Sequence, residues 1–328
     1  MTPLPPLYTE TPLLESSPLS KWLGIPVSLK MESMQPSGSF KNRGIGLLCQ
    51  RSAESGAKHF VISSGGNAGL AVAYAGRILK VPVTVIIPET TPAFMRERIE
   101  LEKAEVIVQG ADFQESDKLA REMALEEGTV YISPFNHPII WEGHASMIHE
   151  AAKQGKKPGA IILSVGGGGL LLGVLQGLYD VGWQDVPVVT VETEGAASFA
   201  KSVQAGKLIT LDKINTIATS LGARRVAEEA FVWSQKHPIF PQIVSDIDTL
   251  QACYRFLDDH RQLVEPACGV ALVPIYERHE YLKDFSSVLV IVCGGNVVSL
   301  SLMEKWKKQL HVGVTPSTDS YSARNASR

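Results

Sequence analysis

The sequence has few cysteines and almost no net charge. Its 328 residues include 4 cysteines and carry a formal charge of −3. Cys49, Cys253, Cys268 and Cys293 lie too far apart for a CxxC metal or redox pair, and a chain of this length does not depend on disulfides. We therefore expect reduced thiols, as in a cytosol. The weak charge argues against nucleic acid or an anionic membrane as a partner.

We also expect no secretory signal, because MTPLPPLYTE has no basic region followed by an apolar stretch. Two uncharged stretches, about residues 159–179 and 285–303, are long enough to suggest membrane spans, but glycines interrupt both. Each fits a buried strand, a glycine turn and a helix start better. From about residue 311 to 328 the apolar periodicity is lost, and we expect a poorly ordered tail.

With 45% hydrophobic residues, the chain can fill one large core or two ordinary ones. Apolar runs rich in β-branched residues occur at 60–63, 81–87, 106–108, 161–165, 186–191 and 288–292. Segments of helical period lie between or after them, at 67–77, 93–103, 112–127, 170–179 and 250–259. Most runs are continuous, which is typical of parallel strands buried on both faces. The pattern predicts an open α/β fold with parallel sheets and a ligand site at the carboxyl ends of the strands.

One lysine stands where a reactive amine could be held. In QPSGSFKNRG, Lys41 follows a turn-forming Pro-Ser-Gly and precedes a helix-compatible stretch. A lysine that loses its proton through desolvation can form a Schiff base with a carbonyl cofactor. Taken alone, the residue fits a surface lysine at a helix start better than a reactive amine.

Two glycine-rich loops join a strand to a helix. In SSGGNAG, residues 63–69, successive backbone N–H groups could converge on a carboxylate or phosphate, although a tight turn that needs glycine explains the loop equally well. In SVGGGGL, residues 164–170, four glycines would each cost roughly 0.5 to 1 kcal/mol relative to alanine inside a regular element, so a purely structural role is disfavoured. Neither a Walker A loop nor a GxGxxG fingerprint is present.

The last buried run ends in VCGG, which puts the Cys293 thiol at a strand's carboxyl end, although cysteine is often only a small core residue. Taken in order, QPSGSFKNRG, SSGGNAG, SVGGGGL, EPACG and VCGG resemble the L-serine/L-threonine dehydratases, or serine ammonia-lyases. These belong to the fold type II, tryptophan synthase β-like enzymes that use pyridoxal phosphate. The resemblance runs from about Thr11 to Leu310, and IWEGHAS at 140–146 is closest to the dehydratase branch.

The resemblance implies a cofactor site. Lys41 would hold pyridoxal phosphate as a Schiff base, Phe40 would pack on its ring, and Asn67 would bond the ring hydroxyl. Cys293 would face the pyridine nitrogen as a neutral thiol, which favours elimination over transamination. The phosphate would rest on the backbone amides of Gly166, Gly167, Gly168 and Gly169.

The resemblance also implies the substrate site and the reaction. The α-carboxylate would bind the loop formed by Ser64, Gly65, Gly66, Asn67 and Ala68. The freed Lys41 amine would remove the Cα proton, and the β-hydroxyl would leave with a proton from the cofactor phosphate. Related serine racemases have a serine at the position of Gly65 that protonates Cα from the other face. We therefore expect little racemisation here, and the effect of Gly65 on turnover is open.

A monovalent cation, usually potassium in this family, is implied near the phosphate loop. Its ligands would be the Glu192 carboxylate and the carbonyls of Ala196, Leu221 and Ala223. A carboxylate that ends a buried strand needs a charge partner, which a cation would supply. The alternative is a water-exposed glutamate at the end of the strand.

The sequence thus predicts a cytosolic pyridoxal phosphate lyase of amino-acid catabolism, acting on L-serine and L-threonine. Two alternatives are a related β-replacement or β-elimination enzyme and a low-activity regulatory homologue. We expect a large cofactor domain from residues 1–44 and 139–310, and a small domain from 45–138 that carries the carboxylate loop. A homodimer is implied by the resemblance alone.

Overall fold

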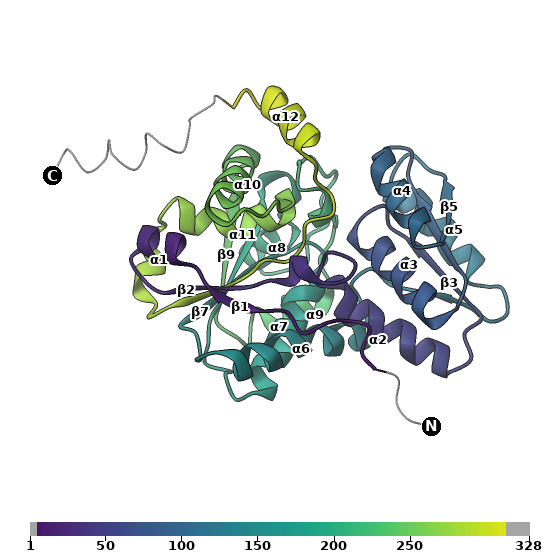
Figure 1. Ribbon diagram of the computed structural model, residues 1–328, viewed down its shortest axis with the longest axis horizontal. Helices are drawn as coiled ribbons and strands as arrows, with labels where there is room; N and C mark the ends of the chain where they lie inside the picture. Colours follow the sequence, from purple (N-terminus) through teal and green to yellow (C-terminus); the bar gives the residue numbers. More distant parts are fainter. Residues whose placement is uncertain (1–4, 313–328) are drawn as a thin grey trace.

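The computed structural model describes residues 5–312, which form two α/β units side by side (Figure 1). The expectation of a poorly ordered tail at 311–328 falls almost entirely outside these residues. The larger unit has a six-stranded sheet in the order β1-β2-β10-β7-β8-β9, and the smaller has a four-stranded sheet in the order β5-β4-β3-β6. All strand pairs are parallel except the antiparallel pair β1 and β2. The predicted fold class, with mostly parallel sheets, is confirmed.

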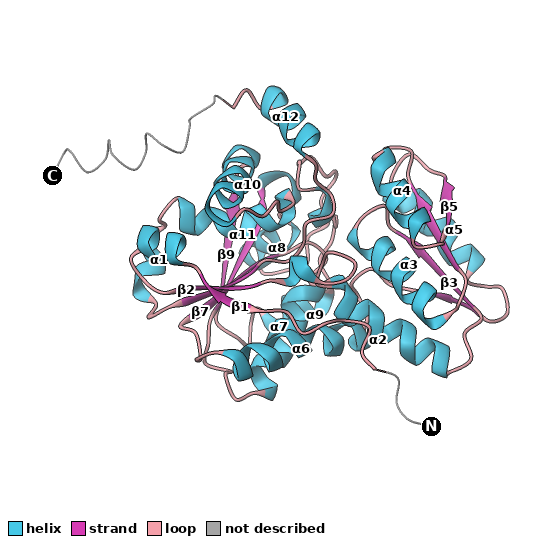
Figure 2. Cartoon of the chain, in the orientation of Figure 1, coloured by secondary structure: helices cyan, strands magenta, loops and turns pink. Residues whose placement is uncertain are grey.

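The larger sheet is covered by helices on both faces (Figure 2). Its strands are β1 (Leu13–Glu15), β2 (Val27–Lys30), β7 (Ala160–Ser164), β8 (Val188–Thr193), β9 (Ile239–Val244) and β10 (Val288–Ile291). The helices of this unit are α1 (Ser17–Leu23), α6 (Pro138–Gln154), α7 (Gly169–Asp180), α8 (Ser198–Ala205), α9 (Glu228–Trp233), α10 (Asp246–His260), α11 (Pro266–Tyr276) and α12 (Leu300–Gln309). Short 3-10 helices are η1 (Glu32–Met34), η2 (Glu194–Ala196), η3 (Thr219–Leu221) and η4 (Glu280–Asp284).

The smaller sheet has its own core. Its strands are β3 (His59–Ser63), β4 (Val83–Ile87), β5 (Glu105–Val108) and β6 (Thr129–Tyr131), and its helices are α3 (Asn67–Leu79), α4 (Ala93–Leu101) and α5 (Phe113–Met123). Phe60, Ile62 and Val85 pack there with the apolar side of α2 (Lys41–Glu54), including Ile45 and Leu48. The helix α2 also packs against α6, so it lies where the two units meet (Figure 1).

The strands with continuous β-branched sequence lie at the centres of the sheets. Every residue of β4, β7, β8 and β10 is buried, as the unbroken apolar runs predict. The strand β9 was not predicted, because it contains Pro241 and lies half-buried at the edge of the larger sheet. The strands β1, β2 and β6 were also missed because they are short: β1 and β6 have three residues each, none of them buried, and β2 has four, VSLK.

The two glycine-interrupted apolar stretches are not continuous helices. Residues 159–179 form β7, a glycine loop and most of α7, and residues 285–303 form β10, a loop and the start of α12. Between residues 5 and 312, the structure contains no helix long and apolar enough to cross a membrane.

Candidate active site

The carboxyl ends of strands from both sheets surround one cavity of about 460 Å³. Its wall includes every residue predicted to bind the cofactor or the substrate carboxylate, namely Phe40, Lys41, Ser64, Gly65, Gly66, Asn67, Ala68, Gly166, Gly167, Gly168, Gly169 and Cys293. The cavity therefore brings together side chains and loops from both ends of the sequence, from Phe40 to Cys293, as expected for a site at the carboxyl ends of parallel strands. Of the four residues predicted to bind a cation, Leu221 and Ala223 line the cavity, whereas Glu192 and Ala196 do not.

Lys41 is the first residue of α2 and projects into this cavity. The preceding residue is fixed by the large sheet, since the Phe40 N–H donates to the Cys293 carbonyl over 2.9 Å. The Lys41 Nζ donates to the Pro134 carbonyl over 2.5 Å. Burial lowers the pKa of Lys41 to about 8, although the nearby Cys293 and Glu265 oppose this shift. An amine with this pKa is partly neutral at neutral pH and can act as a nucleophile or a base.

The Phe40 ring packs against the ring of a buried histidine, His144. The centroids of the Phe40 and His144 rings lie 4.8 Å apart, and His144 Nδ1 accepts a hydrogen bond from the Gly44 N–H over 3.2 Å. Burial, with Lys41 and Arg43 nearby, holds the pKa of His144 well below its usual range. His144 is thus a neutral packing residue beneath the segment that carries Lys41.

The four-glycine loop forms a cradle in which side chains have no room. A Cβ atom at Gly167 or Gly169 would lie closer than 3.0 Å to Phe135, and one at Gly166 would meet the Leu221 backbone. Gly168 has φ +91°, which other residues rarely adopt. The helix α7 begins at Gly169, so its free N–H groups and dipole favour an anion at the loop. This bare backbone fits the phosphate of pyridoxal phosphate.

Cys293 lies two residues after the end of β10 and is buried in the cavity wall. Its Sγ lies 3.7 Å from Ser164 Oγ. A hydrogen bond with Cys268 and burial raise the pKa of Cys293 well above its usual value. The side chain is therefore a neutral thiol, which fits an unprotonated ring nitrogen of a cofactor, whereas a carboxylate would favour the protonated form. Cys268 is fully buried in α11, as expected of a core residue.

The loop after β3 carries the predicted carboxylate-binding residues. Ser64, Gly65 and Gly66 are half-buried, and α3 begins at Asn67. A Cβ atom at Gly65 would lie 2.5 Å from both Cγ2 and Oγ1 of Thr91. Thr91 also lines the cavity, and the sequence alone did not single it out because it follows a different strand, β4.

Glu265 is a site residue that the sequence analysis missed. It precedes Pro266 at the beginning of α11, and a glutamate followed by proline is also typical of an ordinary helix start. Its buried carboxylate, however, accepts from Asn67 Nδ2 over 2.8 Å and from the backbone N–H groups of Asn296 and Val297 over 3.1 and 2.9 Å. The signal available in the sequence was the position of EPACG among the other motifs, since helix N-caps seldom need a glutamate.

Glu192 is the penultimate residue of β8, is buried, and accepts from the backbone N–H groups of Phe199 and Ala200 over 2.9 and 2.6 Å. The water-exposed alternative is therefore wrong. Burial raises the pKa of Glu192 to about 8, although these two hydrogen bonds oppose the shift. The two N–H groups at the start of α8 thus compensate part of the negative charge of Glu192. The burial of this charge is therefore a weaker argument for a bound cation.

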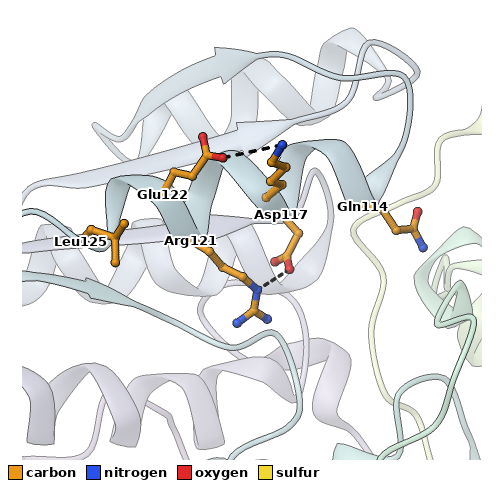
Figure 3. A pocket seen from close by; sticks show the side chains of 6 residues that line it. Gln114, Asp117, Arg121, Glu122 and Leu125 are labelled. Atoms are coloured by element: carbon orange, nitrogen blue, oxygen red, sulfur yellow. Dashed lines mark hydrogen bonds and ion pairs between the residues drawn. The ribbon is translucent and has the colours of Figure 1, made fainter.

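A second hollow lies on the outer face of α5 (Figure 3). Its wall consists of side chains such as Asp117 and Arg121, paired over 2.7 Å, and Leu125, which is 85% exposed. Ion pairs between residues four apart are typical of a solvated helix face. This hollow has no feature of an active site.

The comparisons with known proteins agree with the geometry of the cavity. The L-serine dehydratase/L-threonine deaminase of Mus musculus is 48% identical over 322 residues, which cover 94% of this chain and 98% of that protein. The Homo sapiens protein of the same name is 50% identical over 316 residues, covering 93% and 96%.

A solved structure of a fungal L-serine ammonia-lyase from Rhizomucor miehei superimposes with a TM-score of 0.89 at 38% identity, covering 92% of this chain and 99% of that chain. The family model for pyridoxal-phosphate dependent enzymes matches residues 4–294. The chain therefore belongs to the family of pyridoxal-phosphate dependent enzymes.

Proposed function

We propose that this protein is a pyridoxal phosphate-dependent lyase that deaminates L-serine to pyruvate and ammonia, and L-threonine to 2-oxobutyrate and ammonia. The observation that carries the proposal is the buried Lys41 amine, which shares one cavity with a bare glycine cradle and a neutral thiol. The relatives at 48% and 50% identity that are named for this reaction support it. We do not propose β-replacement, since no residue of the cavity favours it over elimination.

Each part of the cofactor has a matching group in the cavity. Lys41 would hold it covalently, Phe40 would pack on the ring, Asn67 would donate to the ring hydroxyl, and Cys293 would face the ring nitrogen. Its phosphate would rest on residues 166–169. When bound, pyridoxal phosphate supplies an electron sink for the charge that develops at Cα.

The chain's own residues bind the substrate and move its proton. The Ser64 hydroxyl and the backbone N–H groups of residues 65–68 are proposed to hold the α-carboxylate, as a strand-to-helix loop can. Lys41 Nζ would then accept the Cα proton, since its lowered pKa leaves part of the amine neutral. Gly65 offers no side chain that could return a proton from the other face, so we expect racemisation to be slow.

The decisive experiment is an absorbance spectrum of the purified protein, followed by a 2-oxo acid assay. We expect a Schiff-base band that borohydride removes, and 2-oxo acid from L-serine and L-threonine. Lys41→Ala should lose both the band and turnover. An unchanged spectrum in this variant would reject the assignment of Lys41.

We also propose that a monovalent cation binds near Glu192, Ala196, Leu221 and Ala223. Burial raises the pKa of Glu192 to about 8 despite its two backbone hydrogen bonds, so these bonds compensate only part of the buried charge and a bound cation would supply the rest. Replacing potassium by a large organic cation should lower turnover and the unfolding temperature. Equal values in both salts would count against the site.

The proposed domains meet within α2. Arg43 in its first turn binds Glu150 of α6, which belongs to the large unit, whereas Ile45 and Leu48 pack in the small core. This supports a boundary near residue 45, with a second near 138, where α6 begins. We further propose a homodimer, as the family resemblance implies. A cytosolic location is supported by the four free, buried cysteines.

A further inference from the structure

The side-chain amide of Asn67 is held at both ends by residues of the larger unit. Its Oδ1 accepts from Asn296 Nδ2 over 2.8 Å, and its Nδ2 donates to Glu265 Oε1 over 2.8 Å. Asn67 is the first residue of α3, next to the small sheet, whereas Asn296 follows β10 of the large sheet. Two hydrogen bonds of ordinary length thus fix one amide from across the cavity.

Asn296 is itself rigidly placed. Its side chain is 1% exposed, its Nδ2 also donates to the Ser37 carbonyl over 2.5 Å, and its backbone N–H donates to Glu265 Oε2 over 3.1 Å. A Cβ atom at Gly38, which has φ +74°, would collide with Asn296 Oδ1. The loop that precedes Lys41 and the loop that follows Cys293 are thereby locked together around this side chain.

These contacts decide which way the Asn67 amide points. Turning it over would bring its oxygen against the Glu265 carboxylate and its nitrogen against the Asn296 amino group, so both contacts would become repulsive. In the observed orientation one Nδ2 hydrogen is used by Glu265. The second hydrogen points towards Ser220, a residue of the cavity wall. The Oγ atom of Ser220 lies 3.5 Å from Asn67 Nδ2.

We propose that Asn296 and Glu265 are positioning residues that act through Asn67, holding one Nδ2 hydrogen ready for the ring hydroxyl of the cofactor. The inference rests on the proposed function, in which Asn67 donates to that hydroxyl. Neither residue needs to touch the cofactor for this role, although Glu265 forms part of the cavity wall.

The test is a double-mutant cycle read by cofactor binding. The dissociation constant of pyridoxal phosphate is measured by absorbance titration for the wild type, Asn67→Ala, Asn296→Ala and the double variant. A lost hydrogen-bond partner corresponds to a weakening of about fivefold to tenfold in Asn296→Ala. In the Asn67→Ala background, Asn296→Ala should change the constant by less than about twofold, because its effect passes through Asn67.

A second measurement does not depend on affinity. The ionisation of the ring hydroxyl is followed by the pH dependence of the bound cofactor's absorbance. Without an oriented donor the hydroxyl should keep its proton to higher pH, with a shift of about one pH unit in Asn296→Ala. The milder Asn296→Ser, whose hydroxyl has one hydrogen to donate where the amide has two, should shift it in the same direction and replaces the alanine variant if that variant does not fold.

The control is Ser299→Ala, three residues further on, which removes the N-cap bond to the Leu302 N–H without touching the amide network. It should lower the unfolding temperature slightly and leave both cofactor measurements unchanged. Additive effects in the cycle, or an unshifted titration in Asn296→Ala, would overturn the inference. A wild-type protein that forms no cofactor band would instead reject the proposed function.

Discussion

At the scale of single residues, the chemistry depends on burial, which favours the uncharged forms of the two reactive side chains. Lys41 is held with a pKa of about 8 because it is buried, and Cys293 stays protonated for the same reason and through its bond with Cys268. Both groups are less stable in the folded protein when they are charged than they would be in water. Burying a charged group in the site therefore destabilises the cofactor-free protein, and a bound cofactor can offset this loss of folding free energy.

This cost predicts that Lys41→Met stabilises the cofactor-free protein. The folded pKa of about 8 lies below the ordinary value of 10.5, so burying the charged amine destabilises the folded state fully at pH 7. The penalty falls as pH rises from 8 towards 10.5, because the unfolded chain then binds more protons than the folded one. We expect a gain of about 1 to 3 kcal/mol at pH 7, by urea unfolding, that disappears near pH 10.5. A gain that is independent of pH would contradict this origin.

The contact between Gly65 and Thr91 makes a second prediction at this scale. A methyl group at residue 65 would lie 2.5 Å from the Thr91 side chain, so Gly65→Ala should destabilise the protein by about 1 to 3 kcal/mol, as overpacking does. Thr91→Ala removes both atoms in contact, and the double variant should regain most of the loss. Thermal unfolding of the four proteins measures this, and equal losses in the single and double variants would argue against the contact.

At the scale of elements, a buried ion cluster holds the helix that carries Lys41. Arg43, two residues further along α2, binds Glu32 of η1 over 2.7 Å and Glu150 of α6 over 2.6 Å. Lys30 of β2 also binds Glu150, over 2.7 Å. Arg43, Lys30 and Glu32 are inaccessible to solvent, so each depends on its partners.

Removing Arg43 should therefore be costly. We expect Arg43→Met to destabilise the protein by about 3 to 5 kcal/mol, because it leaves two buried carboxylates without their main partner. The matched control is Arg51→Met in the same helix, whose exposed pair with Glu142 should contribute less than about 1 kcal/mol. Chemical denaturation measures the free energy of unfolding of both variants. Similar losses of stability would show that the buried cluster contributes no more than the exposed pair.

At the scale of the whole molecule, the burial of the thiols predicts that they react slowly in the native protein. Cys49, Cys253, Cys268 and Cys293 are all free and buried. In the native protein we expect no rapid reaction of these 4 thiols with a thiol reagent, and a reaction of all 4 in denaturant. A thiol that reacts within seconds in the native protein would show that its region opens readily.

Much of the architecture follows from the sequence because its signals are local. The unbroken β-branched runs predict the central strands β4, β7, β8 and β10, and the glycine loops predict where they end. The edge strand β9 was not predicted because a half-buried strand with a proline has no clear periodic signal. The predicted cofactor and carboxylate residues line one cavity because parallel strands deliver their loops to one side.

The sequence by itself determined the kind of chemistry only through its five motifs taken in order, which resemble those of the serine and threonine dehydratases, because neither a lysine at a helix start nor a glycine loop is specific alone. Only the tertiary structure decided how that chemistry is controlled. Burial lowers the pKa of Lys41, Thr91 fills the space beside Gly65, and Glu265 with Asn296 orients Asn67. These effects depend on distances between residues far apart in the chain, and local sequence carries no signal for such distances.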